Sequence, residues 1–151
     1  MLNKNNVVDI KITKEEDNFF RQYWNIYKKL LFENRNDKQF VEIKNLFLKI
    51  SNNGGKIIFV GNGASASLAS HAATDLTKQG KIASIAFNDH NLITALSNDY
   101  GYERWIEKAL SYYSTSKDLL VLISVSGESP NLIRAMEYAK NHFMTTLSLT
   151  G

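Results

Sequence analysis

The feature that most constrains the fold is a series of short apolar runs separated by stretches with helical periodicity. The apolar runs lie at 56–60, 82–87 and 118–125, and a fourth strand is expected at 145–150. The helical stretches between them lie at 64–78, 91–97, 102–113 and 130–143, with a break expected at 98–101. Short, continuously apolar strands that alternate with helices are typical of a parallel sheet with helices on both faces. The sequence therefore predicts an α/β fold.

Two further helices are expected before the first strand. Thr13 and Glu16 have the spacing of a capping box, and aromatic and leucine side chains recur behind them at helical spacing. A second helix is expected after Asn36. Such stripes are typical of packing, and some of this surface is expected to contact another copy of the chain, because it is hard to bury in a small domain. We place a helical lead-in at 1–55 and the sheet domain at 56–151.

Composition excludes several classes of protein. The chain has 151 residues, of which 44% are hydrophobic and 22% charged, as in one compact domain rather than a disordered chain. The absence of cysteine excludes a disulfide framework and a thiolate metal site. The 18 basic and 15 acidic residues are scattered, so nothing indicates nucleic-acid binding. No stretch suits a signal peptide or a bilayer span of about 20 apolar residues, so we expect a cytoplasmic protein without a membrane partner.

The first predicted strand runs into the loop Gly61-Asn62-Gly63 and then into a helix with a polar face. Ser, Thr, His and Asp side chains share that face, whereas solvated faces usually carry Glu–Lys pairs. This composition favours a polar pocket over an ordinary solvated surface. His71 and Asp75 lie four residues apart and are neighbours on the face. They can share a divalent metal, orient one another for proton transfer, or form a purely structural ion pair.

The second loop, "SVSGESPN", places three hydroxyls between a buried strand and a helix. Ser124 and Ser126 follow the strand, and Ser129 is placed to cap the helix. Hydroxyls and the free N–H groups of a helix start favour a phosphate dianion over a plain serine-rich turn. Neither loop is rich in Lys or Arg, so neutral donors would hold the phosphate. Asp99, at the expected helix break, reads on its own as a capping residue.

Four stretches together resemble the sugar isomerase (SIS) family of phosphosugar-binding domains: "VGNGASASLASHAATDLT", "LITALSNDYGYE", "ISVSGESPN" and "LSLTG". Within this family they look closest to sedoheptulose 7-phosphate (phosphoheptose) isomerases. The resemblance implies a flavodoxin-like three-layer α/β/α sandwich with a five-stranded parallel sheet. It also implies a homotetramer or homodimer with active sites between subunits. The reaction implied converts D-sedoheptulose 7-phosphate to D-glycero-D-manno-heptose 7-phosphate, for nucleotide-activated heptose in lipopolysaccharide or capsule synthesis.

The resemblance also assigns roles to residues. It implies substrate binding by Asn62, Gly63, Ser65, Asp99, Ser124, Ser126 and Ser129. It implies catalytic roles for His71 and Asp75, which also match the metal ligands of zinc-bound members, with one zinc per subunit. Asp75 stands where the family usually has Glu as the base. The carboxylate is expected to move a proton through a cis-enediol.

The family continues past the last motif through a strand and a helix that carries Gln and His, so the sheet domain is expected to be C-terminally incomplete. Two alternatives to an isomerase stay open. One is a phosphosugar-binding module without catalysis, and the other is an oligomeric module that binds another protein.

Overall fold

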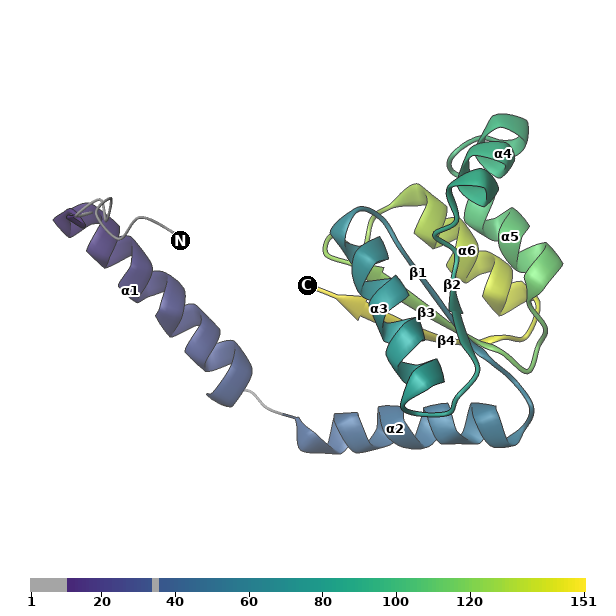
Figure 1. Cartoon of the computed structure of the whole chain (residues 1–151), viewed down its shortest axis with the longest axis horizontal. Helices are drawn as coiled ribbons and strands as arrows, with labels where there is room; N and C mark the ends of the chain where they lie inside the picture. Colours follow the sequence, from purple (N-terminus) through teal and green to yellow (C-terminus); the bar gives the residue numbers. More distant parts are fainter. Residues whose placement is uncertain (1–10, 34–35) are drawn as a thin grey trace, which may run out of the picture. The chain divides into compact units, whose positions relative to one another are not determined.

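A computed structural model describes residues 11–33 and 36–151 of the chain (Figure 1). It divides into two compact units, Met1–Val41 and Glu42–Gly151, and the division falls inside the second helix. Residues 1–10 of the predicted lead-in lie outside the described residues. None of the described helices is long and apolar enough to cross a membrane.

The first unit contains helix α1 (Lys14–Lys28), which continues into the short π-helix η1 (Lys29–Glu33). The predicted capping box is confirmed. The Thr13 hydroxyl accepts from the Glu16 N–H at 3.2 Å, and the Glu16 carboxylate accepts from the Thr13 N–H at 2.8 Å. The aromatic side chains of α1 remain solvent-accessible; Trp24 is 61% exposed. Their contact with another copy of the chain stays a prediction.

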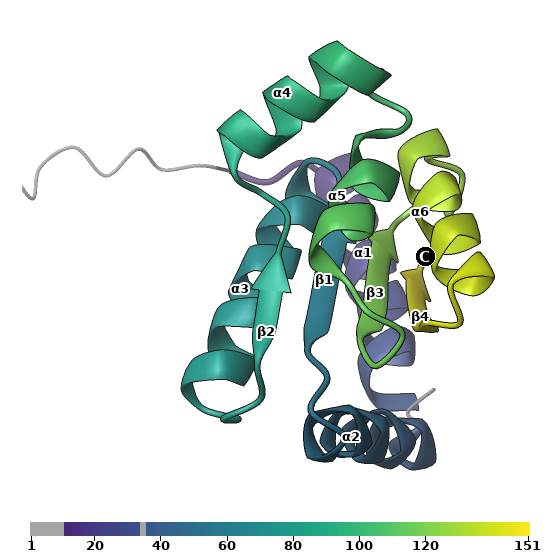
Figure 2. The same ribbon diagram turned by 90° about the vertical axis from the view of Figure 1, so that its right-hand side faces the viewer.

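The second unit is built on a parallel sheet with strand order β2-β1-β3-β4 (Figure 2). Its strands are β1 (Ile57–Gly61), β2 (Ser84–Ala86), β3 (Leu119–Ser124) and β4 (Thr145–Thr150). This order is that of the first four strands of a flavodoxin-like sheet. The described residues therefore supply four of the five strands that the resemblance implied.

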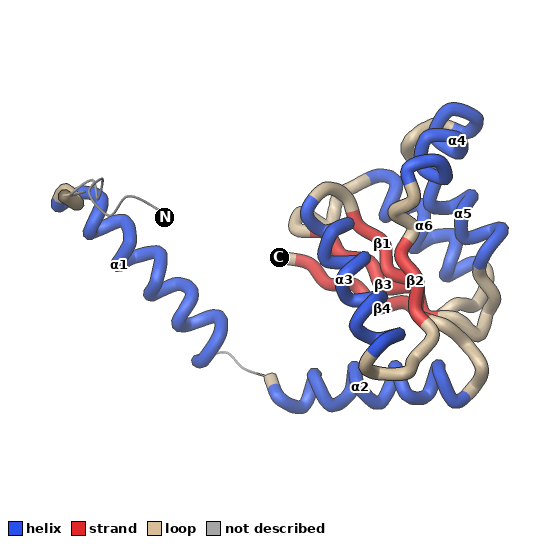
Figure 3. The backbone as a smooth tube through the Cα atoms, in the orientation of Figure 1, coloured by secondary structure: helices blue, strands red, loops and turns tan. Residues whose placement is uncertain are grey.

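Helices cover both faces of the sheet, which confirms the predicted three-layer sandwich (Figure 3). α3 (Ala64–Lys78) lies on one face, and α5 (Trp105–Tyr113) and α6 (Pro130–Asn141) lie on the other. α4 (His90–Tyr100) packs against α5, and α2 (Asp37–Asn52) precedes β1. Side chains alternate along each strand, so Ile57 and Phe59 pack with α3 and the end of α2. Ile58 and Val60 face the other core, with α4, α5 and α6. Strands buried on both faces explain the continuous apolar runs.

One predicted boundary is wrong. The break expected at 98–101 lies at 101–104, because α4 continues through Asn98 and Asp99 to Tyr100 and ends at Gly101, which has φ 86°. Asp99 therefore lies in the last turn of the helix and does not cap it. The N-cap of α4 is Asp89, whose carboxylate accepts from the Leu92 N–H at 3.0 Å.

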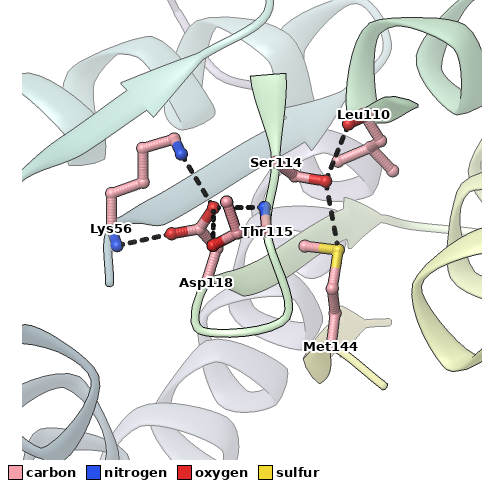
Figure 4. A network of polar contacts seen from close by, with 6 residues as sticks. All are labelled: Lys56, Leu110, Ser114, Thr115, Asp118 and Met144. Carbon is pink, nitrogen blue, oxygen red and sulfur yellow. Dashed lines mark hydrogen bonds and ion pairs between the residues drawn. The ribbon is translucent and has the colours of Figure 1, made fainter. Parts of the chain in front are cut away.

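A polar network lies at the amino ends of β1 and β3, the edge opposite the two predicted loops (Figure 4). Asp118 accepts from the Thr115 N–H at 2.8 Å and from Lys56. Ser114, at the end of α5, donates to the Leu110 carbonyl at 2.7 Å and contacts the Met144 sulfur at 3.3 Å. These contacts fix the starts of the strands whose other ends carry the loops.

Candidate functional site

The two predicted loops meet at the carboxyl edge of the sheet, because β1 and β3 are parallel neighbours with Gly61 opposite Ile123. A pocket of about 370 Å³ lies between them. Its lining residues are Asn62, Ala64, Ser65, Ile123, Ser124, Val125, Ser126, Ser129 and Leu132. Five of the predicted substrate-binding residues, all but Gly63 and Asp99, are thus brought together around one cavity.

Two glycines allow the first loop to turn tightly. A Cβ on Gly61 would lie 2.7 Å from the backbone carbon of Ser65, so only glycine lets the end of β1 approach the first turn of α3 this closely. Gly63 has φ 54° and ψ −124°, a conformation open to glycine and strained for other residues. The turn aims the start of α3 at the pocket.

The three serine hydroxyls of the second loop differ in their hydrogen bonds. Ser124, which is buried, accepts from the Gly127 N–H at 3.1 Å, and Ser126 accepts from the Glu128 N–H at 3.2 Å. Each keeps its O–H to donate to a ligand. Ser129 occupies the N-cap position of α6, but its side chain makes no capping bond, so the predicted cap is wrong. Its hydroxyl is left for the pocket.

The pocket contains no cationic side chain within the described part of the chain, because none of its lining residues is Lys or Arg. Helices α3 and α6 both begin at this edge, and a helix start presents free N–H groups and partial positive charge. An anion held here would therefore be held by hydroxyls, an amide and helix starts, as the sequence predicted.

Asn62 makes contacts that the sequence did not reveal. Its amide exchanges two hydrogen bonds with the amide of Asn131, at 3.0 and 2.9 Å, and its Oδ1 also accepts from the Tyr102 hydroxyl at 3.2 Å. Asn131 is 2% exposed. One signal was present: Asn131 is spaced at four-residue intervals with Ala135 and Ala139 on the buried face of α6.

A second cavity, of about 700 Å³, lies along the polar face of α3. It is lined by Gly63, Ala66, Ser67, Ser70, His71, Thr74, Asn88 and Ile93. Asn88, which the sequence did not single out, donates to the Ser70 hydroxyl at 2.6 Å and to the Ala66 carbonyl. The polar face of α3 therefore lines an open hollow of the surface, and its role in ligand binding stays a prediction.

His71 and Asp75 form a close but solvated pair. The Nε2 of His71 lies 3.3 Å from the Asp75 carboxylate, and their side chains are 78% and 48% exposed. Asp99 is exposed in α4, where it accepts from the Asn98 amide at 3.1 Å, and lines neither of the two cavities.

The described residues do not by themselves complete a zinc site. Zinc takes three or four protein ligands, and His71 and Asp75 supply two. Over residues 11–33 and 36–151, no group of three or more His, Cys, Asp or Glu side chains is placed to hold a metal ion.

Comparison with known proteins agrees with this geometry. The sequence pattern described as "SIS domain" matches residues 18–151. The phosphoheptose isomerase of Helicobacter pylori (strain HPAG1) is 44% identical over 105 residues, which are 66% of this chain and 55% of the relative. Phosphoheptose isomerase 1 of Campylobacter jejuni is 33% identical over 141 residues, 89% of this chain and 76% of the relative.

A solved structure of phosphoheptose isomerase GmhA from Neisseria gonorrhoeae matches with a TM-score of 0.80 and 34% identity. The match covers 92% of this chain and 76% of that one. The chain spans about half the length of several curated relatives: 55% and 58% for two H. pylori strains and 56% for Bordetella avium.

Proposed function

Because this chain belongs to the SIS domain family, we propose that it binds a sugar phosphate and serves an isomerase of the phosphoheptose class. The proposed reaction converts D-sedoheptulose 7-phosphate to D-glycero-D-manno-heptose 7-phosphate. The observation that carries the proposal is the pocket at the carboxyl edge of the sheet, where four serines and Asn62 surround one cavity without a cation.

The phosphate end of the substrate is assigned to this pocket. A dianion there accepts hydrogen bonds from Ser65, Ser124, Ser126 and Ser129 and from the starts of α3 and α6. Neutral donors bind phosphate more weakly than a guanidinium fork does, which suits a product that must leave.

The sugar end is assigned to the polar face of α3. His71 and Asp75 lie six and ten residues beyond Ser65, about 9 and 15 Å along the helix axis. Asp75 is proposed as the base that removes a proton from C1 of the ketose, giving the enediol, and returns it to C2. His71 lies close enough to orient that carboxylate.

Zinc stays part of the proposal in a restricted form. His71 and Asp75 would be two of its ligands, and the others would have to come from outside the described residues, since these provide no third. When bound, zinc would stabilise negative charge on the substrate oxygens.

The test is proton exchange in D₂O. The purified chain is incubated with D-sedoheptulose 7-phosphate and followed by NMR. The expected result is the aldose phosphate with deuterium at C2, and a loss of about 10³-fold in rate for Asp75→Asn. Asp75→Glu is the matched variant, because it keeps the carboxylate and should retain exchange. If the wild-type chain binds neither this ketose phosphate nor inorganic phosphate, the proposal fails.

The same experiment distinguishes an isomerase from the two alternative functions. Exposed aromatic side chains on α1 favour a module that assembles with other chains. Ligand binding without deuterium incorporation would identify a phosphosugar-binding module. Assembly without ligand binding would identify a protein-interaction module.

A further inference from the structure

One backbone N–H, that of Leu132, determines which side-chain atoms of Asn131, Asn62 and Tyr102 donate and which accept hydrogen bonds beside the phosphate pocket. The N–H of Leu132 donates to Asn131 Oδ1 at 3.1 Å, and a backbone N–H can only donate. The atom of Asn131 that faces it is therefore the acceptor. Because the Asn62 amide is hydrogen-bonded to Asn131, the orientation of Asn131 in turn determines that of Asn62.

Asn62 has a single orientation that satisfies these contacts. Its Nδ2 must face Asn131 Oδ1, at 3.0 Å, because two acceptors would repel. Its Oδ1 then accepts from Asn131 Nδ2 at 2.9 Å and from the Tyr102 hydroxyl at 3.2 Å. Both lone pairs of Oδ1 are occupied, and one N–H of Nδ2 is used. The amide of Asn62 has one remaining group to offer, its second N–H.

We propose that Asn131 is a positioning residue that locks Asn62 as a pure donor, so that the pocket selects a ligand oxygen able to accept, such as that of an ionised phosphate, over a ligand group that can only donate. This inference rests on the proposed function, because it assigns the ligand chemistry of the same pocket. Asn62 lines the cavity and Asn131 does not, so Asn131 acts through Asn62.

Burial makes this role specific to Asn131. A side chain that is 2% exposed on the apolar face of α6 would ordinarily be aliphatic, like Leu132, Ala135 and Ala139 on the same helix. A buried amide destabilises the fold unless its polar atoms are bonded. Asn62 and Asn131, which are 69 positions apart in the sequence, satisfy this requirement by bonding to each other. The same bonds determine that Asn62 presents a donor to the pocket.

The first test replaces Asn131 by Leu, which has a similar volume and no polarity. Binding of inorganic phosphate and of D-sedoheptulose 7-phosphate is measured by titration calorimetry, with the melting temperature recorded in parallel. We expect affinity to fall about tenfold as the Asn62 amide becomes free to rotate. The matched control is Asn141→Leu, an exposed asparagine at the end of the same helix. Affinity within about twofold of wild type would overturn the inference.

The second test does not depend on Asn131→Leu folding. In Asn131→Asp, the neutral carboxylic acid has one acceptor and one donor, the same pattern as the amide, whereas the ionised form can only accept. The ratio of variant to wild-type affinity is measured at roughly pH 5, where burial favours the neutral acid, and at roughly pH 8, where the ionised form is favoured. We expect a ratio near one at low pH and about tenfold weaker binding at high pH. Weak binding at both values, or normal binding at both, contradicts the inference.

A third measurement separates this inference from the proposed function. In the ligand-free wild-type chain, one of the two side-chain amide protons of Asn62 should exchange slowly with solvent, as followed by NMR. Rapidly exchanging signals like those of exposed asparagines would refute the locked amide, whatever the ligand. If the signals are as expected but no sugar phosphate binds, the lock stands and the proposed function fails.

Discussion

Both ends of Lys56 bond to one carboxylate, that of Asp118. The Lys56 backbone N–H donates to Oδ1 at 2.8 Å, and its ammonium group donates to Oδ2 at 2.7 Å. Burial by itself raises the pKa of Asp118, but the hydrogen bonds from Lys56 and from the Thr115 N–H outweigh it, so the net pKa is lowered. The pair joins the residues that precede β1 and β3, the two strands that lead to the pocket.

Replacing Asp118 by Asn should make stability at acid pH less dependent on pH. The lowered pKa means that the carboxylate stabilises the fold above its unfolded pKa of about 3.9, and that this contribution is lost as pH falls through the folded pKa. We expect a loss of about 2 kcal/mol at pH 7, below the roughly 3–5 kcal/mol of a fully buried pair because the Lys56 ammonium reaches solvent. Urea unfolding at pH 3 to 7 measures both effects.

Asp17→Asn is the control for this variant, because Asp17 forms an exposed pair with Arg21 in α1. It should change stability little at any pH. If the free energy of unfolding of Asp118→Asn fell as steeply between pH 5 and pH 3 as that of the wild type, Asp118 would not be the origin of the acid sensitivity.

Ser129→Ala and Ser124→Ala should separate binding from stability. The Ser129 hydroxyl makes no capping bond, so its loss should weaken phosphate binding about tenfold and leave the melting temperature nearly unchanged. The Ser124 hydroxyl also accepts from the Gly127 N–H, so its loss should lower both affinity and melting temperature. Calorimetric titration and thermal unfolding measure the two quantities, with the exposed Ser116→Ala as control. Equal destabilisation by both variants would show that the hydroxyl of Ser129 is structural.

Gly61→Ala should damage the pocket more than Gly63→Ala. The new methyl group at Gly61 would meet the backbone of Ser65 at 2.7 Å, so β1 and α3 must move apart, at a cost of about 1–3 kcal/mol. At Gly63 a methyl group would meet nothing within 4 Å, and only backbone strain applies. Phosphate affinity should therefore fall further for Gly61→Ala at matched stability. Unimpaired binding by this variant would show that the close approach is not needed.

Trp24→Lys should dissociate an oligomer that uses α1. The aromatic side chains of this helix contact one another, with Tyr23 and Trp24 edge to face at 5.4 Å between ring centroids, and remain solvent-exposed within one chain. A lysine at the centre of such a surface would have to be desolvated on assembly. Light scattering after size exclusion gives the mass. Phe143→Lys, at an 87% exposed position after α6, is the control. A wild-type chain that is monomeric at high concentration removes the basis for this prediction.

Local patterns predicted the elements well and the contacts between them poorly. The bounds of α3 and β4 agree with those expected from the periodicity and the flanking residues. The pairing of Asn62 with Asn131 joins positions 69 apart, and the spacing of Asn131 with Ala135 and Ala139 indicates its burial but not its partner. The cap at Ser129 failed for a related reason: a side chain at a capping position can remain free for another partner.

The register between β1 and β3 limits where this chain can change length. One residue inserted between Leu119 and Leu120 would turn Leu120 and Val121 toward the wrong cores and carry Ser124 about 3.3 Å along the strand from its neighbour loop. Insertions and deletions in diverging homologues should therefore avoid the strands that end at the serines.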